Sequence, residues 1–181
     1  MPQNYSAVIS FWFHELTPKD WWRKDPDLDR QIAARFLSTH TAAAQCELYE
    51  WRSNPLGRLA EVIVLDQFSR NIFRGSARAF QHDSLALCLA QTAIAANAHE
   101  ALNATQKAFL YMPFMHSESS TIHKVGVKLF AEPGLEWNLD FELKHKAMID
   151  RFGRYPHRNG ILERKSTQEE LDFLKEPGSA F

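Results

Sequence analysis

Cysteine is scarce in this sequence, which holds only Cys46 and Cys88 among its 181 residues. Two thiols cannot supply a disulfide framework, and the apolar, helix-like surroundings of both predict buried free cysteines. The common catalytic signatures are also missing: there is no GxxxxGK[ST] phosphate loop, no GxSxG nucleophile elbow, no HExxH and no paired CxxC. These absences remove the usual sequence indications of a phosphate-loop protein, an elbow-type serine hydrolase or a zinc protein.

An excess of charge of either sign is missing as well. Lysine and arginine number 21, and aspartate and glutamate number 22. Proteins that bind nucleic acid or a membrane surface normally need a basic excess, so neither partner is expected. No apolar run reaches the roughly 18 residues that span a bilayer, and the N-terminus, MPQNYSAVISFWFHEL, lacks the basic start of a signal peptide. With so few cysteines, we expect a cytoplasmic protein.

Apolar residues recur at helical spacing along nearly the whole chain, and strand-like alternation is scarce. Asn54-Pro55 and Asp25-Pro26 read as an N-cap followed by proline in the first helical position. Pro113 is expected to interrupt a helix. The predicted helices cover about 5–14, 25–40 with a short continuation at 44–51, 54–70, 75–97, 103–111, 120–130, 135–152 and a last short helix behind a capping box at Ser166 and Glu169.

Short connections between these helices predict an all-α fold in a single domain, residues 1–181. Successive helices joined by short loops pack as antiparallel neighbours, so we expect stacked helix pairs in a bundle or short solenoid. No internal repeat or long linker divides the chain.

The segment LDQFSRNIFRG, residues 65–75, places charged side chains directly after an apolar run. Asp66 and Arg70 are four residues apart and share one helix face, with Arg74 one turn further on and Asn71 beside them. An exposed pair of this kind stabilises a helix by only about 0.3–0.5 kcal/mol. A buried Asp66 would have to be paired, and it would then orient an arginine. The sequence leaves both interpretations open.

Two further segments carry polar groups. PFMHSES, residues 113–119, holds His116 and Glu118, and histidine titrates near neutrality, so His116 could be a general base. Its serines could equally be helix caps.

DRFGRYPHRN, residues 150–159, is unusually basic beside two aromatic residues. Arginine matches carboxylate or phosphate with a planar fork, although a solvated basic connector has the same composition. The candidates in this second segment are Arg154, His157, Arg158 and Asn159.

Together these motifs resemble DUF924, a bacterial family of uncharacterised proteins. The resemblance rests on FWF (11–13), LDQFSRNIFRG (65–75), the stretch 80–83, PFMHSE (113–118) and FGRYPHRN (152–159), in that order, and it covers nearly the whole chain. It implies a tetratricopeptide-like stack of helices and no particular reaction. The polar signature of the family falls here on Asp66, Gln67, Arg70, Asn71, Arg74, His116, Ser117, Glu118, Arg154, His157, Arg158 and Asn159.

The sequence departs from the family pattern at several positions. Ser69 stands where proline is expected, Tyr155 where phenylalanine is commoner, and Glu163 where glycine is expected. The family continues towards a Gln-Glu pair after the HSE motif, whereas this chain has the run SSTIHK, residues 119–124. If that pair belongs to a site, the site of this chain is modified.

The main functional hypothesis is a concave pocket that holds a small anionic molecule. Either His116 or His157 would transfer a proton, and Asp66 or Glu118 would fix the tautomer of that histidine. The predicted ligand-binding residues are Arg70, Asn71, Arg74, Arg154, Arg158 and Asn159. Neither a metal nor a cofactor is predicted, and the sequence does not indicate an oligomeric state.

Two other classes stay open. A tetratricopeptide-like stack could present a basic groove to an acidic peptide, although fold analogy is weak evidence of function. A closed pocket of roughly 300–1,000 Å³ would favour a small ligand, and an open channel a peptide. The third class is a metal-dependent hydrolase using His116, Glu118 and His157, for which no diagnostic ligand spacing exists.

Overall fold

The computed structural model describes residues 4–179, and this part of the chain folds into helices without a β-strand. The all-α prediction is therefore confirmed. The α-helices are α1 (Tyr5–Ser10), α2 (Pro26–Ala44), α3 (Pro55–Ile63), α4 (Ser69–Ile72), α5 (Asp83–Ala95), α6 (Ala104–His116), α7 (Ser120–Phe130), α8 (Glu136–Phe152) and α9 (Gln168–Phe173). Short 3₁₀ helices cover Asp20–Trp22, Tyr49–Ser53, Ala77–Phe80, Ala98–Ala101 and Pro156–Arg158, and π-helical turns cover Phe11–Glu15 and Val64–Phe68.

The predicted caps begin the helices of the N-terminal half. The Asp25 side chain accepts hydrogen bonds from the amides of Asp27 and Leu28, and Pro26 is the first residue of α2. The Asn54 side chain accepts from the amide of Leu56, and Pro55 begins α3. Each cap satisfies amides that the first helical turn leaves without partners, so these two helices begin where the sequence predicts.

Residues 55–72 form one continuous helical segment that contains a π-helical turn. Helix α3 passes into the turn Val64–Phe68, and α4 continues it to Ile72. A π-turn accommodates one extra residue and shifts the side chains that follow around the helix axis. Asp66 lies within this turn, and Arg70 follows it.

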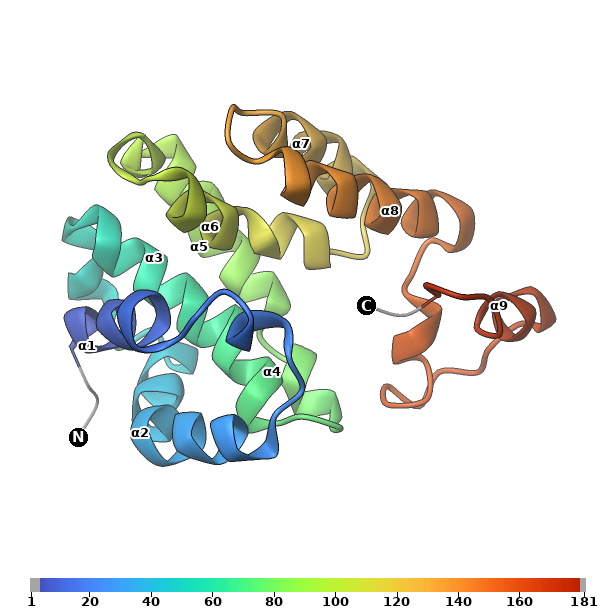
Figure 1. Cartoon of the computed structure of the whole chain (residues 1–181), viewed down its shortest axis with the longest axis horizontal. Coiled ribbons are helices and arrows are strands. Elements are labelled where there is room, and N and C mark those ends of the chain that lie inside the picture. The colour runs from blue at the N-terminus through green and yellow to red at the C-terminus, as the bar shows by residue number, and fades with distance from the viewer. Residues whose placement is uncertain (1–3, 180–181) are drawn as a thin grey trace.

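The helices α5 to α8 pack on one another in sequence order, and α3 packs against α1, α5 and α6 (Figure 1). This arrangement is compatible with a tetratricopeptide-like stack. A continuous core runs through the N-terminal half and α5 to α7, and its largest buried side chains include Trp12, Phe36, Phe68, Phe109 and Phe130. The helices thus form a bundle around aromatic side chains.

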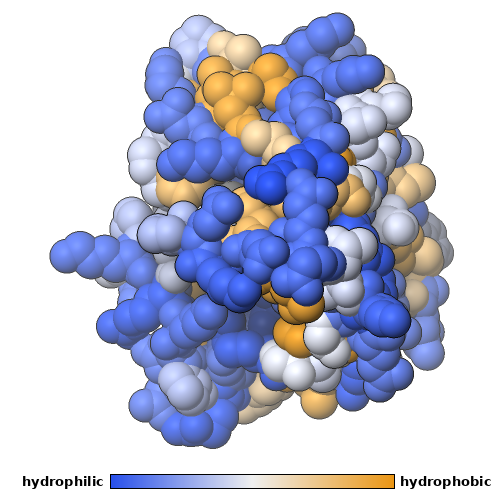
Figure 2. All heavy atoms as spheres, turned by 90° about the vertical axis from the view of Figure 1, so that its right-hand side faces the viewer, coloured by the Kyte–Doolittle hydropathy of each residue, from blue (hydrophilic) through white to orange (hydrophobic). Residues whose placement is uncertain are grey.

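The C-terminal part joins the bundle through a smaller apolar cluster. Met148, Ile149 and Tyr155 are buried together, with Phe152 and Phe173 packed against them. Gly153 ends α8 with a φ of 70°, which glycine adopts without strain. The segment beyond it, with α9, lies beside the end of α8 (Figure 1). Figure 2 shows the face on this side, where hydrophobic residues form small groups among hydrophilic ones.

The prediction that Pro113 interrupts a helix is wrong. Helix α6 runs through Pro113 to His116. A proline inside a helix removes a hydrogen bond and costs about 3 kcal/mol or more. Every residue from Ala108 to Met115 is buried, so packing on all sides of this turn offsets that cost. His116 is consequently the last residue of a helix and not part of a loop.

Three local predictions also differ from the structure. The predicted helix 75–97 is divided into the 3₁₀ helix Ala77–Phe80 and α5. The capping box lies one residue later than predicted, at Thr167 and Glu170, because Arg154 and Asn159 hold Glu170 in place. Cys46 and Cys88 are exposed free thiols and not buried ones, because Cys46 lies in the turn after α2 with a φ of 60° and Cys88 lies on an exposed face of α5.

Among residues 4–179, no helix is long and apolar enough to cross a membrane. The prediction of a single domain for residues 1–181 stays a prediction.

Candidate functional site

The polar site begins with a buried pair between Asp66 and His116. Asp66 is only 1% exposed, and its Oδ1 lies 2.7 Å from Nδ1 of His116. The other carboxylate oxygen accepts a hydrogen bond of 2.6 Å from the side-chain amide of Gln67. Arg70 reaches back to the backbone carbonyl of Asp66 at 2.9 Å and lies 3.3 Å from Oδ1. Asp66 is therefore both buried and paired. Of the two interpretations that the sequence left open, the structure agrees with the buried carboxylate and not with the exposed ion pair.

The surroundings fix the protonation of both partners. Burial alone would raise the pKa of Asp66, but the charge of Arg70 and the hydrogen bonds from His116 and Gln67 bring it well below the ordinary value. Burial lowers the pKa of His116, and Arg70 lowers it further, against the opposing effect of Asp66. The carboxylate is thus charged and the imidazole neutral at pH 7. Since a carboxylate only accepts hydrogen bonds, Nδ1 carries the proton and Nε2 keeps its lone pair.

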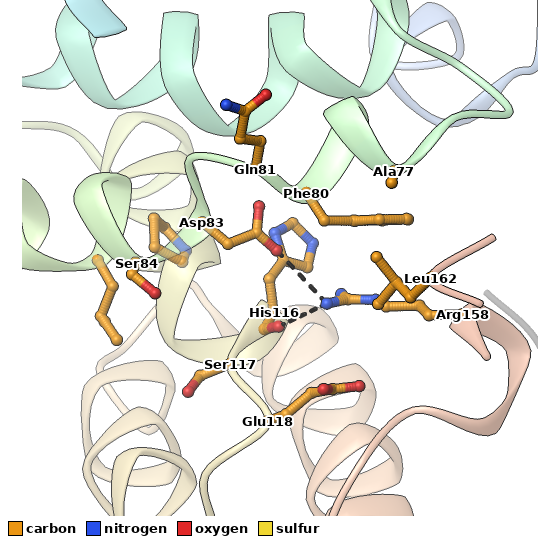
Figure 3. Close-up of a pocket in the computed structure, with 12 residues that line it drawn as sticks. Ala77, Phe80, Gln81, Asp83, Ser84, His116, Ser117, Glu118, Arg158 and Leu162 are labelled. Atoms are coloured by element: carbon orange, nitrogen blue, oxygen red, sulfur yellow. Dashed lines mark hydrogen bonds and ion pairs between the residues drawn. The ribbon is translucent and has the colours of Figure 1, made fainter. Parts of the chain in front are cut away.

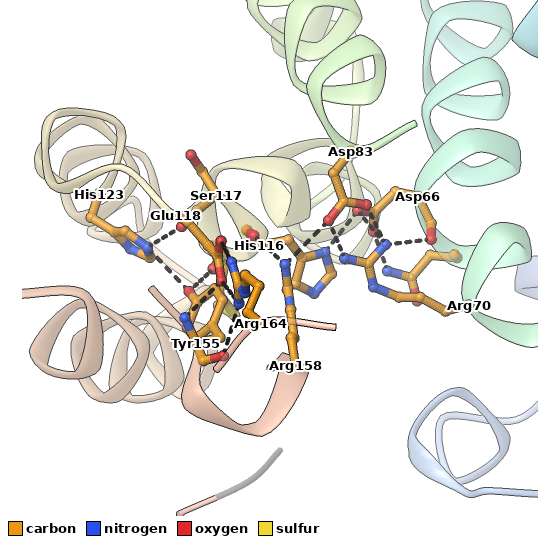
Figure 4. Close-up of polar contacts among 12 residues, drawn as sticks. Asp66, Arg70, Asp83, His116, Ser117, Glu118, His123, Tyr155, Arg158 and Arg164 are labelled. Atoms are coloured by element: carbon orange, nitrogen blue, oxygen red, sulfur yellow. Dashed lines mark hydrogen bonds and ion pairs between the residues drawn. The ribbon is translucent and has the colours of Figure 1, made fainter. Parts of the chain in front are cut away.

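Asp83 joins two arginines from distant segments (Figure 4). It is the first residue of α5, and it accepts both terminal nitrogens of Arg70 at 2.9 and 3.0 Å. Nη1 of Arg158 lies 3.4 Å from the same carboxylate and donates to the backbone carbonyl of His116 at 3.1 Å. This paired geometry engages both terminal nitrogens of Arg70, which leaves fewer donors for a ligand.

Arg158 is a buried cation with donors to spare. It is 6% exposed, and its guanidinium lies 4.6 Å from the ring centre of Phe80 and 4.5 Å from that of Tyr155. Its Nε is buried without a hydrogen-bond partner, and Nη2 makes no hydrogen bond to the residues that the structure describes. Burial lowers the pKa of Arg158, and Arg70 adds to that effect. Arginine stays charged in proteins even so, which leaves an incompletely compensated positive charge.

These groups meet at one pocket, which we call the His116 pocket (Figure 3). Its volume is about 270 Å³. Its polar lining residues are Gln81, Asp83, Ser84, His116, Ser117, Glu118 and Arg158, and its apolar ones are Ala77, Phe80, Leu87, Pro113 and Leu162. Asp66 and Arg70 lie behind this lining, in contact with His116 and Asp83. The structure thus brings Arg70, His116 and Arg158 together from segments far apart in the sequence.

Glu118 ties the pocket to the C-terminal segment. Its carboxylate accepts from both terminal nitrogens of Arg164, at 2.5 and 2.9 Å, and from the amide of Tyr155 at 2.7 Å. Burial raises the pKa of Glu118, but the hydrogen bonds from Arg164 and Tyr155 reverse the direction and lower it. With its oxygens occupied, Glu118 is poorly placed to contact His116, and the carboxylate that does contact His116 is that of Asp66.

A second buried network lies on the other side of the 116–118 segment. Nδ1 of His123 lies 2.7 Å from Glu142, and both residues are fully buried. Nε2 of His123 lies 2.9 Å from the carbonyl of Ser117 and 3.1 Å from the hydroxyl of Tyr155, which donates to the carbonyl of Met115. Because Nε2 must donate to a carbonyl, a proton is also needed between Nδ1 and Glu142. Burial raises the pKa of Glu142, which is consistent with a carboxyl that keeps this proton.

The other predicted site residues lie outside the pocket lining. Asn71 and Arg74 both bind Asp29 of α2, at 2.6 to 2.8 Å. Arg154 binds Glu170 through two nitrogens, and Asn159 contacts Ser166, Glu170 and Arg164. Burial lowers the pKa of His157 to about 4, so it is neutral at pH 7. Four of these residues, Asn71, Arg74, Arg154 and Asn159, therefore connect segments of the fold.

The sequence reasoning missed several participants in the site. Asp83 is the most important, because it is the shared partner of Arg70 and Arg158. A signal existed: two buried arginines need more negative charge than Asp66 provides. Phe80 and Asp83 both fall in the stretch 80–83 that contributes to the family resemblance. Gln67 and Ser117 belong to the polar signature of the resemblance but were not predicted as site residues, and Arg164 was not singled out.

The residues do not fit the metal-dependent hydrolase. Within residues 4–179, no three histidine, cysteine or carboxylate side chains are grouped as metal ligands would be. His116 is engaged by Asp66, and Glu118 by Arg164. We therefore do not carry a metal mechanism further.

Comparison with known proteins gives the family of the chain. Residues 8–178 match a family described as bacterial protein of unknown function (DUF924), and the chain belongs to that family. It is also similar to a solved structure, the protein of unknown function ATU0120 from Agrobacterium tumefaciens. The two share 36% sequence identity with a TM-score of 0.90, over 94% of this chain and 96% of that one. No curated protein matches the chain.

Proposed function

We propose that the His116 pocket binds a small anionic molecule and that His116 acts on it as a general base. The observation that carries the proposal is the 2.7 Å contact between Asp66 and His116, because His116 lies in the wall of the pocket together with Arg158. A base, its orienting carboxylate and a cation are thus adjacent to one cavity. This combination matches the physical criteria for an acid–base site.

The role of His116 follows from its tautomer. Asp66 holds the proton on Nδ1, which leaves the lone pair on Nε2. Nε2 makes no hydrogen bond to any residue among 4–179. A neutral imidazole with a free nitrogen can accept a proton from a ligand, and Asp66 would stabilise the imidazolium that forms.

Arg158 supplies the attraction for an anion. Its charge is shared only loosely with Asp83, at 3.4 Å, and two of its nitrogens lack hydrogen bonds within the described chain. A charge-assisted hydrogen bond to a ligand would compensate this buried cation. The pocket volume of about 270 Å³ lies near the lower end of ligand sites, which favours a small molecule over an acidic peptide. We also propose a cytoplasmic location, which agrees with two unpaired cysteines.

The protonation of His116 provides a first test. We expect nitrogen NMR of the histidine rings at pH 7 to show His116 neutral, with its proton on Nδ1. An imidazolium, or a proton on Nε2, would remove the base and with it the proposed role.

Ligand binding provides a second test. A thermal-shift screen of small anions should yield compounds that raise the melting temperature of the wild type, because a ligand of the native state stabilises it. Arg158→Met should lose this response. Arg74→Met removes an arginine that binds Asp29 outside the pocket, so it should keep the response even if its own stability falls. An equal response in both variants would place binding elsewhere.

A further inference from the structure

We propose that the ligand of the His116 pocket is a monocarboxylate with a compact apolar body. This inference rests on the proposed function and narrows it, because the same pocket could otherwise accept phosphorylated molecules. Three properties of the pocket carry the inference: its balance of charge, the free edge of Arg158 and its apolar wall.

The ionised side chains around the pocket are equal in number for the two signs, although Arg158 is paired only loosely with Asp83. Arg70, Arg158 and Arg164 face the carboxylates Asp66, Asp83 and Glu118 in ion pairs, and His116 is neutral. A carboxylate ligand adds one negative charge. A phosphoryl group adds about 1.5 to 2 negative charges at neutral pH, in a wall that contains Asp83 and Glu118. Repulsion from these two carboxylates therefore disfavours the dianion.

The free donors of Arg158 fit two oxygens in one plane. Nη1 is used by Asp83 and by the carbonyl of His116, whereas Nη2 and Nε have no partner in the described chain. Nη2 and Nε form one edge of the planar guanidinium, which is the edge that receives a carboxylate in a bidentate pair. Because Nε is buried, the carboxylate would first accept a hydrogen bond from Nη2. It would accept the second hydrogen bond, from Nε, once it lies fully inside the pocket.

The rest of the wall suits an apolar body of limited size. Phe80, Leu87, Pro113 and Leu162 form the apolar part of the pocket lining, and Phe80 lies beside the guanidinium of Arg158. A volume of about 270 Å³ corresponds to roughly nine water molecules at about 30 Å³ each. Bonded atoms lie closer together than separate water molecules, so a compact ligand such as benzoate fits within this volume. Its ring would lie against the apolar side chains and its carboxylate against Arg158.

A titration of the wild-type chain with four probes tests the proposal. Benzoate is compared with benzamide, which lacks the charge, with phenylphosphonate, which carries more charge, and with acetate, which lacks the body. Binding is measured by calorimetry, and the amide signals of Ser117 and Glu118 report by NMR whether the probe enters the pocket. We expect benzoate to bind at least tenfold more tightly than each of the others and to shift these signals.

Two variants connect the preference to the pocket. Arg158→Met should reduce the preference for benzoate over benzamide to less than threefold, while Arg74→Met keeps it. Leu87→Trp should fill the pocket and weaken benzoate at least tenfold without changing any charge. Leu87→Trp also tests the proposal if circular dichroism shows that Arg158→Met does not fold.

The outcomes separate the inference from the proposed function. Equal or tighter binding of phenylphosphonate or benzamide in the pocket would overturn the inference that the ligand is a monocarboxylate, but the pocket would still be a ligand site. Tight binding of acetate would overturn the inference that the ligand has an apolar body. Failure of all four probes to shift Ser117 and Glu118 would overturn the inference and count against the ligand pocket itself. Benzoate binding that Leu87→Trp does not weaken would also overturn it.

Discussion

At the scale of single residues, Asp66 shows how one buried charge organises its neighbours. It accepts hydrogen bonds from Gln67 and His116 and lies beside Arg70 while only 1% exposed. Removing one member of such a buried ion pair leaves the other uncompensated. Stability and site geometry therefore depend on the same carboxylate.

We predict that Asp66→Asn lowers the free energy of unfolding by about 3–5 kcal/mol at pH 7. Because the pKa of Asp66 is lowered in the folded state, its contribution is present above about pH 4 and is lost as the pH falls through the folded-state value. Denaturant unfolding from pH 7 to pH 2 would show a steeper acid loss in the wild type than in the variant. Asp27→Asn, at an exposed position, should change little, and an equal effect there would contradict the argument.

Glu163 is a residue whose backbone conformation suits glycine better. Its φ is 54°, and the amides of Arg164 and Glu163 bond to the carbonyls of Asn159 and Gly160, the pattern of a Schellman turn. This is the position where the family resemblance led us to expect glycine. The left-handed conformation costs a residue with a side chain about 1–2 kcal/mol.

We predict that Glu163→Gly raises the free energy of unfolding by roughly 0.5–1 kcal/mol. Glycine removes the backbone strain, but its larger loss of conformational entropy on folding offsets part of that gain. Glu163→Ala should give no such gain, because alanine keeps the strain. Chemical denaturation of the three proteins measures the difference. A loss of stability in the glycine variant would mean that the Glu163 side chain makes a stabilising contact.

At the scale of helices, α7 and α8 are joined by a buried hydrogen bond between His123 and Glu142. Glu142 of α8 and His123 of α7 share its proton, and Gly126 leaves the room, because a Cβ there would lie 2.7 Å from Oε1 of Glu142. The pair holds the carbonyl of Ser117 and so fixes the end of α6 that carries His116.

We predict that the contribution of Glu142 to stability decreases as the pH rises above its ordinary pKa of 4.5. Its folded-state pKa is raised, so the contribution is present below the unfolded value and is lost as the pH rises through the folded value. Glu142→Gln keeps a donor for His123 without a titrating group, so its stability should vary less as the pH rises above 4.5. Glu142→Leu, which leaves His123 without that donor, should be less stable throughout. Parallel pH profiles of the wild type and the glutamine variant would rule out the shared proton.

The features of the helices that the sequence predicts correctly are those set by neighbouring residues. Asp25-Pro26 and Asn54-Pro55 begin helices because caps act within one turn. The partners of the site are not local: Asp66 and His116 are 50 residues apart, and Arg74 and Asp29 are 45 apart. Sequence placed Asp66, His116 and Arg158 among the candidates, but it could not say which carboxylate faces which cation. Pro113 was misread for a similar reason, because packing from other helices decides whether a helix continues.

At the scale of the whole molecule, the main core and the C-terminal cluster are joined by polar contacts. Arg164 with Glu118, Arg158 with Asp83, and the hydroxyl of Tyr155 with the carbonyl of Met115 connect them. The pocket lies at this junction. Changes in the C-terminal segment should therefore reach the pocket without unfolding the main core.

We predict that Glu118→Gln speeds amide hydrogen exchange in residues 155–164 at least tenfold and leaves α3 and α6 protected. The variant removes the charge that pairs with Arg164 and keeps the shape of the side chain. Exchange followed by NMR measures the difference, and Glu169→Gln, in an exposed pair with Arg151, provides the control. Uniform acceleration across the chain would mean that the two parts unfold together.

The π-turn Val64–Phe68 also sets how this site can change by insertion and deletion. A helix advances about 100° for each residue, so loss of one residue from the turn would rotate everything beyond it by that angle. Chain length and hydrophobicity would hardly differ, yet Arg70 would leave Asp83, and Asn71 and Arg74 would leave Asp29. The extra residue thus sets the rotation of the helix that brings two arginines and one asparagine to their carboxylate partners. Relatives with one residue fewer here would need a different set of partners.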